Sequence, residues 1–412
     1  MSGYSNSFWP CEDHDSSRSQ VVNKSLDATL EPFITSRSVI LATMAVFKDN
    51  TSLFLLRHTA GDNAISFVEK LDPFTLVPLG RSEDLPGGKT WPGSIGIHRN
   101  GFIYVVFGNH IHKLDDGLNI VATSKLPRDR PYNGFIILDD GTIITKDFGG
   151  RLPNTAEDPC QSVQLLAIDP DDLLIMDTLT LDEKSIARIS SYKNRIYVVG
   201  EDSIFEIKYL DRFQSESLRR FNYRTMESQQ YGWDCVVNEN FAWFLDSGEG
   251  TENYSGNFIG KGNSTIPINL VRVDLRSSEV TLTPLSDKAK SIVANPPLWD
   301  ISRQIVVAFD SSNGILKGFQ LGTNNDLAEI WSREQNHASH MVLFGGNGAL
   351  VTCDFNTKTN EEDIVILDIT TGAEIKRIGS QSNFQSVVFL SPGVNNDLYY
   401  ISFSTITRVA FV

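Results

Sequence analysis

The fold is decided by residues 94–126, which read SIGIHRNGFIYVVFGNHIHKLDDGLNIVATSKL. Four apolar runs of strand length alternate with turn residues in this stretch. The Asn100-Gly101 pair between the first two runs predicts a two-residue hairpin turn, because both central positions of such a turn need a positive φ. The stretch therefore predicts a unit of four antiparallel strands without a helix.

The same unit recurs along the chain. A second copy begins with NGFIILDDGTIITKDF at residues 133–148, where Asp140-Gly141 takes the position that Asn100-Gly101 has in the first copy. The hairpin between the third and fourth runs repeats an apolar residue followed by Asp, as in LDPFTLVPLG (71–80), LDDGLNIVAT (114–123), IDPDDLLIMD (168–177), VDLRSSEVTL (273–282) and LDITTGAEIK (367–376). Neighbouring copies lie roughly 40 to 50 residues apart, and four strands per period are typical of a β-propeller.

The first strands of the repeats can be counted, and they predict eight blades. They start near Ile40, Ser94, Asn133, Ile186, Cys235, Ile292, Met341 and Ser386. The last blade has only three strands of its own, so a segment before Ile40, such as Ser19 to Leu30, is expected to supply the fourth and protect the sheet edge. The chain then divides into an N-terminal segment, 1–37, that contributes the closing strand, and a single propeller domain, 38–412. Seven blades are the second choice, because 183–300 is irregular.

An apolar–Asp–x–x–Thr/Ser–Gly hairpin within a four-stranded repeat resembles the pyrroloquinoline-quinone-like repeat of quinoprotein-type propellers, which usually have eight blades. The resemblance covers most of residues 38–412 and concerns the fold. The dehydrogenases of that family carry two adjacent cysteines near their cofactor. No two of the cysteines Cys11, Cys160, Cys235 and Cys353 are adjacent, so pyrroloquinoline quinone is not expected as a cofactor.

The amino-acid composition of the chain excludes some classes of binding partner. The 412 residues carry 51 acidic and 36 basic side chains, a net charge of −15, without a Lys/Arg cluster. Such a chain is not expected to bind nucleic acid or an anionic membrane, because both rely on basic side chains. No apolar run approaches the ~18 residues of a membrane span, the first twenty residues do not resemble a signal peptide, and the dispersed cysteines fit a reducing compartment. A cytoplasmic protein is expected, of undetermined oligomeric state.

In a propeller blade, the loop before the first strand and the end of the second strand lie on the same face. Side chains from these two positions are therefore expected to line a small-molecule site around the axis. The residues expected to bind the ligand are Trp91, Tyr132, Asn133, Trp233, Asp234, Trp299 and Asp300 before first strands, and Lys146, Asp147, Asp246 and Asp310 at the ends of second strands.

Both sets have a structural alternative. The tryptophans can wedge between blades, and an Asp at a strand end can fold its carboxylate onto local backbone N–H groups. If the acids do face one axis, a buried pair could do acid–base work or hold Ca²⁺. The sequence contains no convincing metal-binding motif.

The predicted catalytic residues are His340 and Asp354, with His337 beside them. His340 precedes a first strand and Asp354 ends the second strand of the same blade, so antiparallel pairing brings them close. A carboxylate beside an imidazole favours general acid–base chemistry. The sequence thus predicts a small-molecule-binding propeller, with a hydrolase, lyase or isomerase as the first hypothesis. The alternative is a non-catalytic binding or scaffold propeller for protein or glycan partners.

Overall fold

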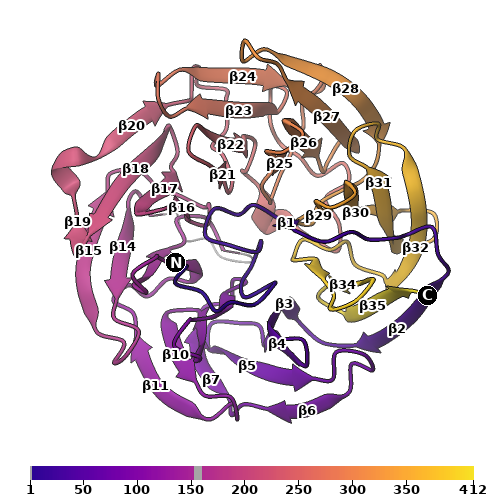
Figure 1. Cartoon of the computed structure of the whole chain (residues 1–412). Helices are drawn as coiled ribbons and strands as arrows, with labels where there is room; N and C mark the ends of the chain where they lie inside the picture. The colour runs from indigo at the N-terminus through magenta and orange to yellow at the C-terminus, as the bar shows by residue number, and fades with distance from the viewer. Residues whose placement is uncertain (1, 153–159) are drawn as a thin grey trace. The chain divides into compact units, whose positions relative to one another are not determined.

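The computed structural model describes residues 2–152 and 160–412, and these form an eight-bladed, all-β propeller fold of four-stranded antiparallel sheets (Figure 1). The helical elements of the described residues are two 3-10 turns, η1 (Ser215–Ser217) and η2 (Thr251–Asn253). None of the helices in these residues is long and apolar enough to cross a membrane. The predicted fold class and blade count are therefore confirmed.

Blades 1 to 4 belong to the first of two compact units, together with residues 2–18. Their strands are β3 (Ala42–Asp49), β4 (Ser52–His58), β5 (Ala64–Leu71), β6 (Pro78–Arg81) and β7 (Leu85–Gly88); β8 (Ser94–Ile97), β9 (Ile103–Phe107), β10 (His110–Leu114) and β11 (Ile120–Lys125); β12 (Tyr132–Ile137), β13 (Ile143–Asp147), β14 (Val163–Ile168) and β15 (Ile175–Leu181); and β16 (Ser190–Tyr192), β17 (Arg195–Val199), β18 (Ser203–Leu210), β19 (Arg212–Phe213) and β20 (Arg219–Asn222).

Blades 5 to 8 fall in the second unit, apart from Val237–Glu239. Their strands are β21 (Val236–Val237), β22 (Phe241–Leu245), β23 (Asn269–Asp274) and β24 (Val280–Pro284); β25 (Leu298–Asp300), β26 (Ile305–Asp310), β27 (Ile315–Leu321) and β28 (Leu327–Glu334); β29 (Val342–Phe344), β30 (Ala349–Asn356), β31 (Glu361–Asp368) and β32 (Glu374–Ser382), with β1 (Val21–Val22) parallel to β29; and β33 (Ser391–Pro392), β34 (Asp397–Ile401), β35 (Thr405–Phe411) and β2 (Pro32–Ser38).

The fourth strand of the last blade comes from the other end of the chain. β2 pairs antiparallel with β35 over seven residues, from Pro32 opposite Phe411 to Ser38 opposite Thr405. Ser19–Leu30, the segment favoured from sequence, lies just before this strand instead. Its two-residue strand β1 pairs with β29 of blade 7, so the closing strand begins later than expected.

The first hairpin turn of blades 2 and 3 differs from the prediction by one residue. The Gly101 N–H donates to the His98 carbonyl at 2.9 Å, which centres the turn on Arg99 and Asn100. Gly101 then follows with φ 90°, and Gly141 has the same place in blade 3 with φ 104°. The turn is thus a three-residue loop that ends in a left-handed glycine, and the predicted pair of positive φ angles was wrong for Asn100.

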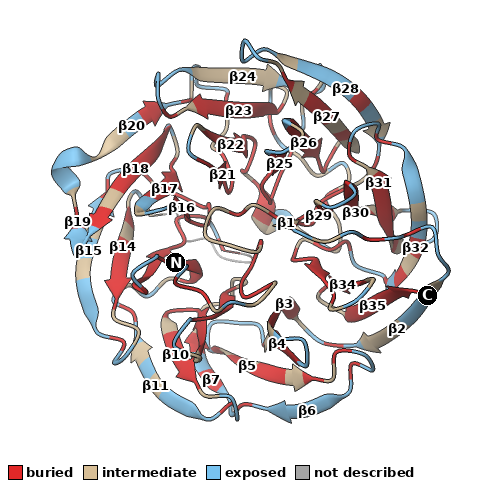
Figure 2. Ribbon diagram, viewed as in Figure 1, coloured by how far each residue is buried: buried red, intermediate tan, exposed pale blue. Residues whose placement is uncertain are grey.

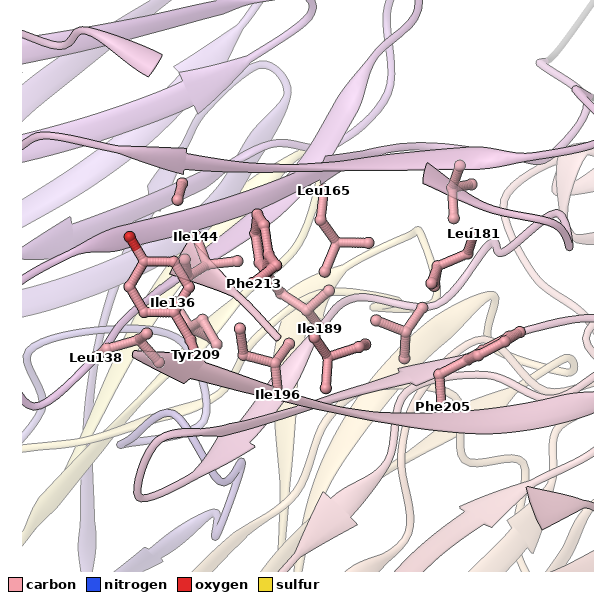
Figure 3. Packing of buried hydrophobic residues seen from close by; sticks show 14 residues of the cluster. Ile136, Leu138, Ile144, Leu165, Leu181, Ile189, Ile196, Phe205, Tyr209 and Phe213 are labelled. Atoms are coloured by element: carbon pink, nitrogen blue, oxygen red, sulfur yellow. The ribbon is translucent and has the colours of Figure 1, made fainter. Parts of the chain in front are cut away.

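Two hydrophobic core clusters of the first unit lie between neighbouring blades. The first strands β8, β12 and β25 are buried throughout, whereas the outermost strands β6, β11 and β15 are mostly exposed (Figure 2). One cluster joins blades 3 and 4, where Ile136, Ile144 and Leu165 meet Ile196 and Phe205 (Figure 3). Leu166 of the same strand points the other way, into the cluster between blades 2 and 3. Burial on both faces explains why these strands read as continuous apolar runs.

Candidate functional site

Within a blade, the loop before the first strand meets the end of the second strand. Tyr132, at the start of β12, pairs with Asp147 at the end of β13. In blade 5 the Trp233 N–H donates to the Leu245 carbonyl at 3.0 Å. The two sets of loops thus share one rim of each of these blades, as blade topology requires.

An aromatic pair marks this rim in the first unit. The Trp91 indole stacks on the Phe148 ring, with centroids 4.2 Å apart and planes inclined by 21°. Phe148 directly follows Asp147 and is buried, whereas Trp91 is half-buried. Phe148 of blade 3 therefore supports the Trp91 ring, which remains partly accessible to solvent.

Two arginines from the loop before β12 flank the aromatic pair. Arg128 Nη1 donates to Asp147 Oδ2 at 3.0 Å and to the Ser162 carbonyl at 2.7 Å. Arg130 donates from Nε to the Phe148 carbonyl at 3.0 Å and from Nη2 to the Gly150 carbonyl at 2.9 Å. Both guanidinium groups are fixed by these bonds, and neither residue is fully buried.

Asp147 and Lys146 lie beneath the arginines. Asp147 is fully buried, and its Oδ1 accepts a hydrogen bond from the Gln164 N–H at 2.6 Å. Lys146 is buried as well, and its Nζ donates to the Ser185 carbonyl at 3.1 Å. The Tyr132 hydroxyl accepts the Arg128 N–H at 3.3 Å, and burial raises the pKa of this phenol.

Asn133 completes the set of predicted ligand residues in this unit. Its Nδ2 donates to the Ile186 carbonyl at 2.9 Å, and its own carbonyl accepts from Arg188 Nε at 2.7 Å. The side-chain oxygen of Asn133 is buried without a hydrogen-bond partner among the described residues. Arg188 also reaches the Pro92 carbonyl, at 3.4 Å, which connects Asn133 to the loop that carries Trp91.

We call Trp91, Phe148, Arg128, Arg130, Lys146 and Asp147 the Trp91 rim. Five of the predicted ligand residues lie in it or beside it, namely Trp91, Tyr132, Asn133, Lys146 and Asp147. Sequence reasoning missed Phe148, Arg188 and Arg128, and it placed Arg130 in the loop before a first strand without choosing it as a ligand residue. The alternation Arg128-Asp129-Arg130 directly before a first strand was the one available signal in an otherwise acidic chain.

Cys160 lies near these charges. Burial, and next the Asp147 carboxylate, raise the pKa of its thiol, although Arg130, Lys146 and Arg128 act in the opposite direction. A thiol with a raised pKa remains protonated at neutral pH and is a poor nucleophile. The Trp91 rim is therefore suited to binding rather than to thiol chemistry.

Asp246 ends the second strand of blade 5 and is enclosed by donors. Its Oδ1 accepts from the Asn269 N–H at 2.6 Å, and its Oδ2 accepts from Asn269 Nδ2 at 2.7 Å and Gln229 Nε2 at 3.0 Å. Burial raises its pKa to about 6 in spite of these bonds. The carboxyl group therefore fixes the start of β23, as the structural alternative proposed.

Blade 6 corrects the prediction for Trp299 and Asp300. Asp300 pairs with Ile305 at the turn between β25 and β26, and its Oδ1 accepts the Ser302 N–H at 2.9 Å. Asp310 lies at the other end of β26, where its Oδ1 accepts the Ser312 N–H at 3.0 Å. Trp299 and Asp300 thus end the first strand rather than precede it, because β25 begins only at Leu298.

Trp233 and Asp234 precede the first strand of blade 5, as expected. Both are buried, with 2% and 0% of their surface exposed. The indole N–H of Trp233 has no hydrogen-bond partner among the described residues. Their burial agrees with a packing role for this part of the rim.

The predicted catalytic residues lie in blade 7. His337 is fully buried, its Nδ1 accepts the Cys353 N–H at 3.1 Å, and burial lowers its pKa to about 4. His340 is also buried, and its ring packs on Phe389 with centroids 3.8 Å apart.

Asp354 takes part in a local network. Its Oδ1 accepts the Asn336 N–H at 2.8 Å, and its Oδ2 accepts from Arg377 Nη1 at 2.9 Å. These bonds hold the loop before β29, which is the non-catalytic role considered from the sequence. The catalytic pairing of His340 with Asp354 stays a prediction.

Metal ligands do not gather in the described part of the chain. Residues 2–152 and 160–412 contain no group of three or more His, Cys, Asp or Glu side chains placed to hold a metal ion. None of the four cysteines, which all lie among the described residues, forms a disulfide bond; three of them are buried and Cys160 is half-buried.

Comparison with known proteins gives the fold alone. No protein-family model and no curated protein sequence matches the chain. Among solved structures, a quinohemoprotein alcohol dehydrogenase from Pseudomonas putida HK5 is similar over 98% of this chain and 80% of its own, with TM-score 0.63 and 6% identity. BamB from Moraxella catarrhalis matches 90% of this chain and all of its own, with TM-score 0.54 and 12% identity. Sqt1 from Chaetomium thermophilum matches 88% and 93%, with TM-score 0.57 and 12% identity. The resemblance to quinoprotein-type propellers is confirmed at the level of the fold.

Proposed function

We propose that this chain is a ligand-binding propeller whose Trp91 rim takes a small molecule with a flat ring and a negative charge. The observation that carries the proposal is the half-buried Trp91 stacked on Phe148 and flanked by Arg128 and Arg130. An exposed aromatic face binds planar groups by offset stacking. A guanidinium group binds carboxylate and phosphate through paired N–H donors.

The arginines retain donors for such a ligand. Hydrogen bonds within the described chain use Nη1 of Arg128 and use Nε and Nη2 of Arg130. Nε and Nη2 of Arg128 and Nη1 of Arg130 thus remain for an anionic group. The groups are also pre-positioned, which lowers the entropic cost of binding.

The charge balance of the rim favours an anion. Arg128, Arg130 and Lys146 outnumber the carboxylates of Asp147 and Asp129, the latter lying between the two arginines in sequence, in a chain whose net charge is −15. A local excess of positive charge on an acidic protein attracts anions at short range. The net charge of −15 disfavours a large polyanion, because the chain as a whole repels it.

Binding rather than catalysis is proposed, because Asp354, the predicted catalytic acid, and two of the acids predicted to bind the ligand are engaged in structure. Asp246, Asp310 and Asp354 each accept backbone N–H groups near their strand ends. A carboxylate held in this way orders a loop and is poorly placed to exchange protons with a substrate.

Isothermal titration calorimetry tests this function with matched ligand pairs. Benzoate and phenyl phosphate carry ring and charge, whereas benzamide and benzyl alcohol carry the ring alone. The charged members are expected to bind and the neutral members to bind at least about tenfold more weakly, because a charge-assisted hydrogen bond contributes about 1.5–3 kcal/mol.

A matched pair of arginine variants supplies the control. Arg130→Gln is expected to weaken benzoate binding about tenfold. Arg99→Gln is expected to leave it unchanged, since Arg99 also donates to two carbonyl groups but lies at a hairpin turn of blade 2. Equal affinities for charged and neutral ligands, or equal losses in both variants, would contradict the proposal.

A further inference from the structure

Residues 3–18, which we call the strap, bind along the first strands of the first unit. The Ser5 N–H donates to the Ile97 carbonyl at 2.8 Å, and the Ile97 N–H donates to the Pro10 carbonyl at 2.8 Å. Further along, the Ser191 N–H donates to the Ser16 carbonyl at 2.6 Å. The strap is thus held by backbone bonds in the manner of an added strand.

The strap carries charges that are unusually buried for a terminal segment. Arg18 donates to Asp13 Oδ2 at 2.8 Å and to Glu12 Oε1, and each of the three residues is at most 3% exposed. Arg18 Nε also donates to the Ile189 carbonyl of blade 4, at 3.2 Å. Buried charges of this kind are tolerated only while each has its partner, so the docked position of the strap depends on this network.

One member of the network leads to the Trp91 rim. Glu12 Oε2 lies 3.5 Å from Arg188 Nε. The same guanidinium group donates to the Asn133 carbonyl at 2.7 Å and to the Pro92 carbonyl at 3.4 Å. Because Pro92 follows Trp91 directly, Arg188 joins the strap to the loop that presents the stacking surface.

The local sequence leaves room for this link. A Cβ atom at Gly134 would lie 3.2 Å from the Arg188 side chain and 3.4 Å from Glu12 Oε1. The contact with Arg188 is tighter than most Cβ contacts and the one with Glu12 is ordinary, so the absence of a side chain at Gly134 lets Arg188 pack closely against the backbone here. The link is therefore built into the backbone beside Asn133.

We infer that the strap regulates the Trp91 rim through the Glu12–Arg188 pair, with Arg188 as a positioning residue. This inference rests on the proposed ligand-binding function of the rim. With the strap docked, Glu12 orients Arg188, which holds the Pro92 and Asn133 carbonyls and so fixes Trp91. With the strap released, Arg188 loses its carboxylate and the loop before β8 loosens.

Two hollows border the strap on its solvent side. A hollow of about 410 Å³ lies between Asn6–Phe8 of the strap and Lys48–Thr51 of the first turn in blade 1. A second, of about 200 Å³, is lined by strap residues 15–17 and by the turns at Asp139 and Lys193.

Glu12→Gln tests the link in the full chain. The amide keeps an oxygen for Arg18 but removes the negative charge, so Arg188 loses its ion-pair partner. Hydrogen exchange followed by mass spectrometry is expected to show about tenfold faster exchange in peptides covering 89–97 and 131–137. Benzoate affinity is expected to fall about tenfold.

Two further variants make the outcome decisive. Arg188→Lys keeps the charge but cannot bond both carbonyls, and it is expected to reproduce both effects in a folded protein. Asp15→Asn changes a strap carboxylate that bonds Ser17 and His14, and it is expected to leave both readouts near wild type.

Exchange separates the two claims, because it needs no ligand. Unchanged exchange in both Glu12→Gln and Arg188→Lys would overturn the link, whether or not benzoate binds. Faster exchange equal to that of Asp15→Asn would also overturn it, since general loosening would explain the result. If wild type binds no charged ligand while exchange responds as expected, the proposed function fails and the strap's control of the loop stands.

Discussion

At the scale of single residues, buried titratable groups control how stability depends on pH. Burial lowers the pKa of His58, His112 and His337 to about 4 from an ordinary 6.5. As pH falls, these histidines bind protons near pH 6.5 in the unfolded chain but only near pH 4 in the folded chain. Each histidine therefore contributes stability above pH 6.5 that is lost as pH falls toward 4, on the order of 1–3 kcal/mol each.

Asp246 changes the pH dependence of stability in the opposite direction. Burial raises its pKa to about 6 from 3.8, so the folded state binds this proton first, and its contribution is lost as pH rises from about 4 to 6. Melting temperatures measured from pH 7 to 4 are expected to fall below pH 6.5. Asp246→Asn is expected to steepen that fall, because the opposing gain disappears. A flat profile, or identical slopes in wild type and variant, would refute these assignments.

The residue scale is also where sequence reasoning was weakest. It placed Tyr132 and Asp147 correctly on one rim, because strand pairing alone decides that contact. It misplaced Trp299, because the long loop before Leu298 moves the start of the first strand further along the chain. The local sequence pattern does not indicate this shift. It missed Arg188 as a contact of Pro92 and Asn133, since such a contact depends on side-chain reach across blades.

At the scale of strands and hairpins, the sequence was more informative. The repeated Asp of the outer hairpin is explained by the turn itself: Asp368 Oδ1 accepts the Thr370 N–H at 2.8 Å and the Thr371 N–H at 2.9 Å. The same Asp opens the hairpin at Asp72 and Asp274. Periodic turn chemistry therefore revealed the repeat, and counting the first strands gave the eight blades, whereas the hairpin turn at Gly101 differed from the prediction by one residue.

The closing strand gives an element-scale prediction. Deleting residues 1–37 removes most of β2 and leaves β35 as an unpaired edge, so a sharply lower melting temperature or aggregation is expected. Because this deletion also removes the strap, the double variant Ile34→Pro/Thr35→Pro serves as a second test. One of two adjacent residues must donate to β35, so the double variant removes a ladder hydrogen bond worth about 1 kcal/mol, and a proline ring is poorly accommodated within a paired strand. Both proteins melting like wild type would contradict the role of β2.

At the scale of the whole molecule, the contrast between overall and local charge is the main functional clue. The chain carries −15, yet Arg128, Arg130 and Lys146 gather beside Trp91. Similarity of fold does not identify a ligand, because propellers of the same architecture carry unrelated functions. The function must therefore be read from the rim, and the most direct test is whether a charged ring reaches Trp91.

Fluorine NMR of the chain labelled with 5-fluorotryptophan makes that measurement. The sequence contains six tryptophans, and Trp91→Phe assigns the Trp91 resonance by its disappearance. Titration with phenyl phosphate is expected to shift the Trp91 resonance and to leave those of the buried Trp243 and Trp299 in place, while benzyl alcohol at the same concentration leaves Trp91 nearly unmoved. A Trp91 resonance that does not respond to phenyl phosphate, or that responds equally to both ligands, would contradict an anion-binding rim.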